Sequence, residues 1–181
     1  MCARRPVINI IEKKILMNSF EVFEISVGAA LLGISRLPGL QGNFLADIEK
    51  IFNWKPAVIV SLTEKKEIED LGASDLISFI EKEKIPWLHF PIKDFGIVER
   101  QQEILWEPIS KNIYQKIKDG DRILLHCRGG CGRTGMIVLR IMIDFGEDPD
   151  EALERLRKIR PCAVETKAQE NWARMAGPNN S

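Results

Sequence analysis

A single α/β domain, with a central and mainly parallel sheet flanked by helices, is the fold class that the sequence predicts. Short apolar runs alternate with segments of helical periodicity from Phe20 onward, and this alternation is typical of parallel strands connected by helices. The run AVIVSL at 57–62 is almost continuously apolar, as expected of a strand that is buried on both faces. A chain of 181 residues has room for one well-filled domain rather than two.

The first half of the chain is expected to contribute strands and two helices. The strands are short apolar runs at 20–25, 29–35, 57–62 and 87–92. The helices cover 43–52 and 74–84, where apolar residues recur at helical spacing. The inward face of the first helix is predicted to carry Phe44, Leu45, Ile48, Ile51 and Phe52.

The second half is expected to add one strand, at 122–126, and further helices. These helices cover 101–118, 134–145, a segment that begins at Asp148, and 166–176. Pro108 is expected to kink or split the first of them. Asp148 and Pro149 form a helix start, because aspartate caps a helix and proline suits the first helical position. Residues 1–19 are assigned to an N-terminal segment and residues 20–181 to the domain.

The charges of the chain balance, with 26 Lys and Arg against 26 Asp and Glu. This balance gives no support to a nucleic-acid or membrane partner, because bulk attraction requires net charge. The longest uncharged run, at 25–35, is too short to cross a bilayer as a helix. The cysteines at 2, 127, 131 and 162 do not form a disulfide framework for a domain of this size. A reducing compartment and a cytoplasmic location are therefore expected, and no particular oligomeric state is predicted.

The motif HCRGGCGRTG, at 126–135, follows a buried strand and precedes a helix. Ligands bind at the carboxyl ends of strands in such folds, and a helix N-terminus attracts phosphate through its unpaired N–H groups. Glycines let successive amides turn inward to form an anion nest. The predicted phosphate-binding residues are Arg128, Gly129, Gly130, Cys131, Gly132 and Arg133. Arg128 has two interpretations. Its side chain either adds positive charge to the rim of the site, or it is solvated and only the backbone amide of Arg128 contributes to binding.

The side chains of the motif predict nucleophilic chemistry. Arg133 can bind two oxygens of an anion with its guanidinium fork. A cysteine beside an arginine and a helix N-terminus can act as a thiolate nucleophile, so Cys127 is the predicted nucleophile. Thr134 is placed to donate a hydrogen bond to that thiolate. His126 is expected to order the loop rather than to act as a base, because a thiolate needs no base.

Other loops of similar composition fit less well. A nucleotide P-loop requires a lysine that the motif lacks, and a rhodanese-like loop is usually one residue shorter. A zinc site built from His126, Cys127, Cys131 and Cys162 is disfavoured, because Cys-x3-Cys is unhelpful spacing and two arginines would repel the cation. Within the loop, Cys131 is either an inert small side chain or a partner for a reversible disulfide with Cys127.

Cleavage of a phosphate monoester also requires a proton for the leaving oxygen. Asp94 fits this role, because it directly follows the strand predicted at 87–92 and so lies at the same end of the sheet as the motif. Glu99 and Glu103 are the alternatives, although each falls at a helix start, where acidic residues are common for capping alone.

Cys-x5-Arg-Thr resembles the signature loop of the cysteine-dependent protein tyrosine and dual-specificity phosphatase superfamily. The segments SRLPG, HFPIKDFG, LLHCRGGCGRTG and LRKIRPCAVETKAQ resemble, within it, the kinase-associated type of atypical dual-specificity phosphatase. The resemblance implies a phosphatase-like fold and a catalytic domain over 20–181. It implies Cys127 as the residue that forms a phosphocysteine, Arg133 as phosphate clamp and Asp94 as acid and then base, with no metal or cofactor.

One position departs from the family. Related phosphatases often carry glutamine where Glu165 stands, and that glutamine helps to place the hydrolytic water, while Gln169 matches a second family glutamine. Both are candidates for the hydrolysis step, and packing or capping is the alternative for both.

The expected function is hydrolysis of phosphotyrosine in protein substrates, with phosphoserine and phosphothreonine as further substrates. A phosphoinositide or small-molecule phosphatase is the second hypothesis. Such enzymes often carry an extra basic residue within the loop, where this chain has Cys131. An inactive phosphate-binding adaptor is the third, and it is disfavoured because the nucleophile, arginine, hydroxyl and acid are all present.

Overall fold

A five-stranded sheet forms the centre of the computed structural model, which describes residues 19–175. The strand order is β1-β2-β5-β3-β4. The strands are β1 (Phe23–Val27), β2 (Ala30–Arg36), β3 (Val58–Ser61), β4 (Trp87–His89) and β5 (Arg122–Cys127). Only β1 runs antiparallel to its neighbour, and the other pairs are parallel. The predicted α/β fold with a mainly parallel sheet is therefore confirmed.

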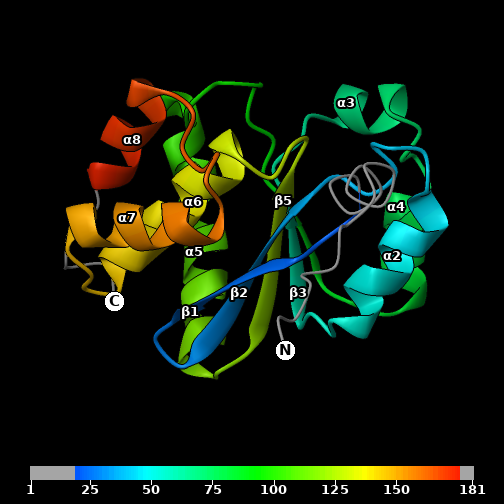
Figure 1. The fold of residues 1–181 in the computed structure, drawn as a ribbon, viewed down its shortest axis with the longest axis horizontal. Coiled ribbons are helices and arrows are strands. Elements are labelled where there is room, and N and C mark those ends of the chain that lie inside the picture. Colours follow the sequence, from blue (N-terminus) through cyan, green and yellow to red (C-terminus); the bar gives the residue numbers. More distant parts are fainter. Residues whose placement is uncertain (1–18, 176–181) are drawn as a thin grey trace, which may run out of the picture.

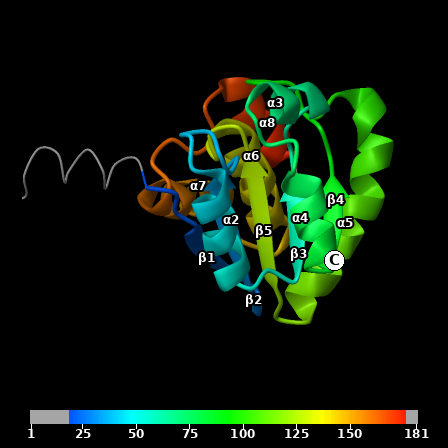
Figure 2. The same cartoon turned by 90° about the vertical axis from the view of Figure 1, so that its right-hand side faces the viewer.

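Helices cover both faces of this sheet (Figure 1). One face carries α2 (Phe44–Asn53) and α4 (Leu76–Lys82), which lie in front of the sheet in Figure 2. The other face carries α5 (Glu103–Lys118), α6 (Gly132–Asp144), α7 (Pro149–Ile159) and α8 (Lys167–Arg174). The short α3 (Lys65–Asp70) lies at the end of the sheet where β5 terminates, and a 3-10 turn at Arg100–Gln102 precedes α5.

Strand β5 lies in the middle of the sheet and separates two hydrophobic cores. Ile123 and Leu125 face the core formed with α5, α6, α7 and α8, whereas Leu124 faces the core formed with α2 and α4. This alternation follows from the two-residue period of a strand with helices on both sides. The strand ends at Cys127, which is 3% exposed. The nucleophile predicted from the sequence is thus fixed at the end of a strand that is buried on both faces.

Several details of the predicted elements are wrong. Helix α5 is a single helix that Pro108 does not split, and β4 ends at His89 rather than at residue 92. Helix α3 was not predicted, because the segment KKEIED is six residues long and contains one apolar residue. On α2, Leu45 is 64% exposed rather than inward. The helix is rotated so that Asp47 faces inward, where its carboxylate accepts a hydrogen bond from the backbone N–H of Gly39 at 3.0 Å.

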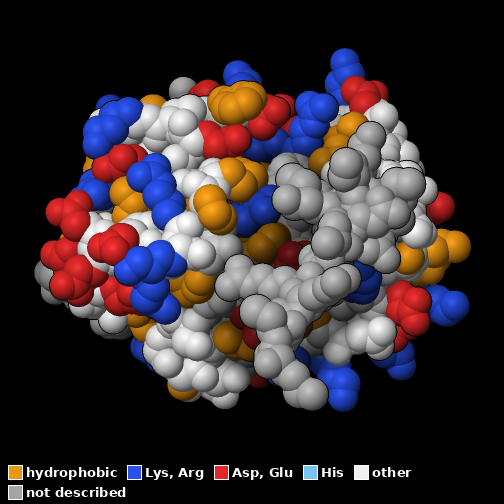
Figure 3. Space-filling view, in the orientation of Figure 1, with side chains coloured by type: hydrophobic (Ala, Val, Ile, Leu, Met, Phe, Trp, Pro, Cys, Tyr) orange, Lys and Arg blue, Asp and Glu red, His pale blue; other side chains and the backbone are white. Residues whose placement is uncertain are grey.

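The surface agrees with the balanced composition. Basic and acidic side chains are interspersed over the face shown in Figure 3, and no broad region of one sign occurs on it. No helix among residues 19–175 has the length and apolar character needed to cross a membrane. The N-terminal segment assigned to 1–19 lies, apart from its last residue, outside the described residues.

Candidate active site

The loop that follows β5 turns its carbonyl groups outward. The carbonyl of Arg128 accepts a hydrogen bond from the N–H of Leu37 at 3.1 Å, and the carbonyls of Gly129 and Gly130 accept hydrogen bonds from Arg160 at 2.8 and 3.1 Å. In a trans peptide the next N–H points the opposite way. The amide N–H groups of Gly129, Gly130 and Cys131 therefore point away from these partners, as an anion nest requires.

A Cβ on either of two glycines of the loop would lie too close to a neighbouring atom. Gly130 has φ +65°, and a Cβ there would lie 2.5 Å from the carbonyl oxygen of Ser35. Gly132 begins α6, and a Cβ there would lie 2.2 Å from Oε2 of Glu165. The first of these contacts is to backbone, so it cannot relax by a change of side-chain rotamer. The loop can thus approach β2 closely and leave the start of α6 open.

Arg133 is buried in the first turn of α6, with its side chain 1% exposed. Its Nη1 donates to Oε2 of Glu67 at 2.6 Å and to the carbonyl of Ile92 at 2.9 Å. Its Nη2 donates to Oε1 of Glu67 at 2.8 Å and to Oδ1 of Asp94 at 2.9 Å. Burial alone would lower the pKa of Arg133, but Glu67, Cys127 and Asp94 hold that pKa above its ordinary value. The guanidinium is therefore a fixed cation with a set orientation.

Glu67 on α3 is the site residue that the sequence analysis missed. Its carboxylate forms a two-point pair with Arg133 and also accepts a hydrogen bond from the backbone N–H of Glu64 at 2.8 Å. Burial raises the pKa of Glu67, but the bonds from Arg133 and Glu64 outweigh it and leave the pKa below its ordinary value. A signal was present, because Glu64 and Glu67 form a capping box just after β3, at the same sheet edge as the loop.

Asp94 lies on the loop after β4 and reaches the same cation. One carboxylate oxygen contacts Arg133, and the other lies 4.0 Å from Nη1 of Arg128. The Asp94 side chain is 41% exposed, so it remains accessible to a ligand. The two alternative acids are engaged elsewhere: Glu99 belongs to a capping box on the 3-10 turn, and Glu103 accepts a hydrogen bond from Trp172.

His126 and Thr134, which flank the loop, are both fully buried. Nε2 of His126 lies 2.6 Å from the hydroxyl of Ser61, which also accepts a hydrogen bond from the indole N–H of Trp87. Burial is the main cause that lowers the pKa of His126 to about 4, so the imidazole is neutral at pH 7. The hydroxyl of Thr134 has no hydrogen-bond partner among residues 19–175.

The side chains of Gln169 and Glu165 both lie next to Gly132, the first residue of α6. The side-chain oxygen of Gln169 accepts hydrogen bonds from the backbone N–H groups of Glu165 and Thr166, at 3.0 and 3.3 Å. Its amide nitrogen donates to the carbonyl of Gly96 at 3.1 Å. Gln169 thus caps α8 and holds the loop that carries Asp94. The Glu165 carboxylate is exposed and lies over Gly132.

The cysteine pairing differs from the prediction. Cys131 forms a disulfide with Cys162, and Cys127 is the free cysteine of the described residues. The alternatives of an inert Cys131 or a Cys127–Cys131 pair are therefore wrong, because the segment after α7 brings the Cα of Cys162 within 5.2 Å of that of Cys131. The zinc hypothesis fails for the same reason, since two of its four ligands are bonded to each other. The disulfide also removes one premise of the predicted cytoplasmic location.

Comparison with known families agrees with this geometry. The family model described as "Polymorphic toxin system, DSP-PTPase phosphatase" matches residues 46–147, which is more than half of the chain. The chain belongs to this DSP-PTPase phosphatase family. The match begins in α2 and extends through α6, so it includes the strand, loop and helix that hold Cys127 and Arg133. The superfamily predicted from the signature loop is confirmed.

Individual relatives of this DSP-PTPase protein are identical to it at up to about a third of the aligned positions. "Putative tyrosine phosphatase 067L" of Invertebrate iridescent virus 3 is 30% identical in an alignment of 147 positions that covers 73% of this chain and 60% of the viral protein. "Cyclin-dependent kinase inhibitor 3" of Mus musculus is 25% identical in an alignment of 148 positions that covers 78% of this chain and 69% of the mouse protein. The chain thus spans about three fifths to two thirds of the length of these relatives.

Solved structures of phosphatases share the fold. Kinase associated phosphatase, with its catalytic-site cysteine replaced by serine, superposes with a TM-score of 0.74 over 86% of this chain and 93% of that one, at 19% identity. Tk-PTP in its active form gives a TM-score of 0.64 over 80% and 90% of the two chains, at 27% identity. The DSP-PTPase chain therefore has the phosphatase fold that the resemblance implied.

Proposed function

We propose that this protein hydrolyses phosphate monoesters on protein side chains, phosphotyrosine first and phosphoserine and phosphothreonine in addition, through a phosphocysteine on Cys127. The single observation that carries the proposal is the arrangement around Cys127. A loop whose carbonyls are all turned outward joins this buried cysteine to the start of α6, with the fixed cation of Arg133 in the first helical turn. Such a site binds a tetrahedral dianion next to the sulfur of the cysteine.

In the first step the Cys127 thiolate attacks phosphorus while Arg133 and the loop amides bind the phosphoryl oxygens. The S–P bond forms, the P–O bond to the alcohol breaks, and Asp94 gives its proton to the departing oxygen. Asp94 holds Nη2 of Arg133, and a bidentate phosphate needs that nitrogen. Substrate binding therefore displaces the Asp94 carboxyl group from the guanidinium toward the leaving oxygen.

In the second step water attacks the phosphocysteine, Asp94 accepts the proton of that water, and the Cys127 thiolate departs. The buried hydroxyl of Thr134, without a partner in residues 19–175, is available to donate to the departing thiolate. Of the two candidates for the hydrolysis step we assign Glu165, because its carboxylate is exposed over Gly132. The polar atoms of Gln169 are engaged in capping and in holding Gly96, so its role is to position the acid loop.

The residue at the fifth position of the loop, counted from Cys127, favours protein substrates over phosphoinositides. Cys131 is bonded to Cys162 there, so it offers no cation for additional phosphate groups. We propose residues 20–181 as the catalytic domain and a phosphoprotein as the partner. The cytoplasmic location stays a prediction, because the disulfide removes one of its premises.

Release of phosphate from an aryl phosphate by the purified full chain, in the presence of a metal chelator, tests the proposal. Cys127→Ser should remove turnover and retain phosphate binding, and equal release by both proteins would show that the cysteine mechanism is wrong. Asp94→Asn should slow esters with poor leaving groups by roughly a hundredfold, the usual contribution of a general acid, and should slow activated esters far less. A panel of phosphopeptides and phosphoinositide vesicles then separates the two substrate classes. Binding of phosphopeptide without any turnover would indicate the adaptor.

A further inference from the structure

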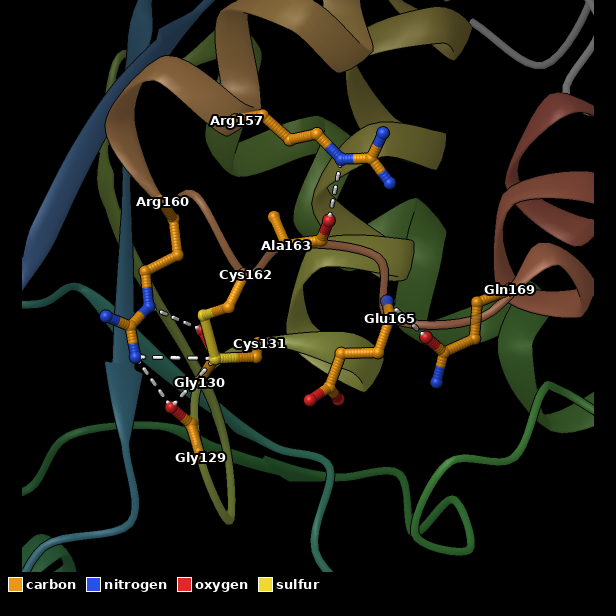
Figure 4. The surroundings of a disulfide bond; sticks show 9 residues. All are labelled: Gly129, Gly130, Cys131, Arg157, Arg160, Cys162, Ala163, Glu165 and Gln169. Atoms are coloured by element: carbon orange, nitrogen blue, oxygen red, sulfur yellow. Dashed lines mark hydrogen bonds between the residues drawn. A yellow bond between two sulfur atoms is a disulfide. The ribbon is translucent and has the colours of Figure 1, made fainter.

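The Cys131–Cys162 disulfide joins two segments that both border the candidate active site. Cys131 lies inside the loop after Cys127 and is the residue before α6. Cys162 lies in the segment that connects α7 to α8, 31 residues further along the chain. Figure 4 shows the bond crossing directly between these two segments. The nucleophile takes no part in it, since Cys127 is free.

Arg160 reinforces the same connection. It precedes Cys162 by two residues and donates to the carbonyls of Gly129 and Gly130, which are the groups that must point outward for the anion nest to form. Its Nη2 also lies 3.5 Å from Sγ of Cys131. The segment after α7 thus holds the loop by a covalent bond and by hydrogen bonds to the two adjoining carbonyls (Figure 4).

The other end of this segment carries Glu165. Arg157 donates to the carbonyls of Ala163 and Val164 at 3.1 and 3.0 Å, and Val164 has φ +62°, a conformation that a β-branched residue rarely adopts. The backbone N–H of Glu165 is held by Gln169. The disulfide therefore fixes the loop to the same rigid segment that places the Glu165 carboxylate over Gly132.

We propose that the Cys131–Cys162 disulfide is a redox-controlled clasp on the phosphate loop, closed in the more active enzyme and opened by reduction. The proposal rests on the proposed function. Both cysteines are partly exposed, so a small thiol can reach the bond, and accessible disulfides are the labile ones. One thiolate of a dithiol reductant attacks one sulfur and releases the other cysteine as a thiol. The second reductant thiolate then releases the first cysteine, so that one disulfide and one dithiol exchange their two electrons and two protons.

The direction in which oxidation changes the activity distinguishes this clasp from oxidation of the nucleophile Cys127. Oxidation of Cys127 removes the thiolate and lowers activity, whereas oxidation of the clasp restores the ordered loop and raises activity. Opening the clasp leaves the Arg160 contacts in place, so we expect a partial loss. A decrease of roughly three- to tenfold in kcat/KM is the size expected when a preorganised loop loses one of several anchors.

The test uses the full chain with Cys2→Ser, so that three cysteines remain. After equilibration with oxidised dithiothreitol, alkylation under denaturing conditions followed by mass spectrometry should label Cys127 alone, and labelling of all three cysteines would overturn the proposal. Aryl phosphate turnover is then measured in mixtures of oxidised and reduced dithiothreitol. Activity should fall as the mixture becomes more reducing, and an unchanged or rising activity would refute the clasp.

Two variants complete the experiment. Cys162→Ser should have the activity of the reduced protein at every redox setting, and the same should hold for the Cys131→Ser and Cys162→Ser double variant. If either kept the redox response of the parent, the response would come from Cys127 and the clasp would be wrong. In the Cys127→Ser background, inorganic phosphate should raise the Tm of the protein by a larger amount when the disulfide is closed. This readout needs no turnover, so it distinguishes failure of the clasp from failure of the proposed phosphatase activity.

Discussion

Replacing Glu67 with glutamine is expected to destabilise the protein and slow catalysis, because Glu67 is the main partner of a buried cation. The Arg133 side chain is 1% exposed and the Glu67 side chain 16%. Glutamine keeps one acceptor, but its amide nitrogen would face a guanidinium nitrogen, so one of the two bonds is lost together with the negative charge. A hydrogen bond between charged groups contributes about 1.5–3 kcal/mol, and breaking a fully buried ion pair costs about 3–5 kcal/mol.

Asp94 still contacts Arg133 in the variant, so the lower part of that range applies. We expect the free energy of unfolding to fall by about 2–3 kcal/mol, which is roughly 5–10 °C in Tm for a chain of this size. Catalysis should slow as well. Without Glu67 the guanidinium of Arg133 would turn toward Asp94, and Asp94 would then be less available to donate its proton. If about half of the lost energy applies in the transition state, kcat/KM falls by roughly tenfold.

The matched control is Glu69→Gln, which makes the same charge change at an exposed position of the same helix. Urea denaturation and steady-state kinetics with an aryl phosphate measure both effects. The folded-state pKa of Glu67 is lowered, so its stabilisation is present above the ordinary pKa of 4.5 and is lost as pH falls through the folded pKa. The glutamine variant should lack this acid dependence. If the two variants match in stability and kcat/KM, then Glu67 does not orient Arg133.

Three further perturbations test other parts of the site. Gln169→Ala releases the carbonyl of Gly96 and should lower kcat more than it raises KM. It should also alter the acid-dependent limb of the pH–rate profile, and an unchanged profile would contradict a positioning role for Gln169. Gly130→Ala puts a Cβ against the carbonyl of Ser35 at a positive φ, so it should abolish stabilisation by inorganic phosphate, and normal stabilisation would mean that the loop tolerates a side chain. The folded-state pKa of His126 is lowered from 6.5 to about 4, so the unfolded chain binds more protons and stability should fall by about 3 kcal/mol between pH 6.5 and 4. Denaturation of His126→Asn should lack that loss, and an equal slope in both proteins would assign it elsewhere.

The sequence was sufficient to predict the fold and the main loop because each rests on a local pattern. The apolar run before His126 predicts a strand buried on both faces, and the glycines after it predict a sharp turn into a helix. Asp94 could be placed because parallel strands end at one edge of a sheet, which is a topological rule rather than a measured distance.

Contacts between distant segments could not be read in this way. Cys162 is far from Cys131 in sequence, and no spacing rule indicates that the chain returns to the loop after α7. Glu67 belongs to a short polar helix that periodicity cannot detect, although its capping box was readable. Leu45 was misplaced because hydrophobicity favoured it over Asp47, whereas the hydrogen bond from Gly39 decided which side of the helix faces inward.

The hydrogen bonds from Arg160 to the loop carbonyls have a consequence for biosynthesis. The nucleophile, the arginine and the acid are all translated before α7, but the groups that hold the carbonyls of Gly129 and Gly130 and the acid loop belong to residues made afterwards. A nascent chain that ends after α6 contains Cys127, Arg133 and Asp94 and lacks Arg160, Glu165 and Gln169. The reactive thiol is therefore translated well before the geometry that would activate it, and the enzyme becomes competent only when its last helix has docked.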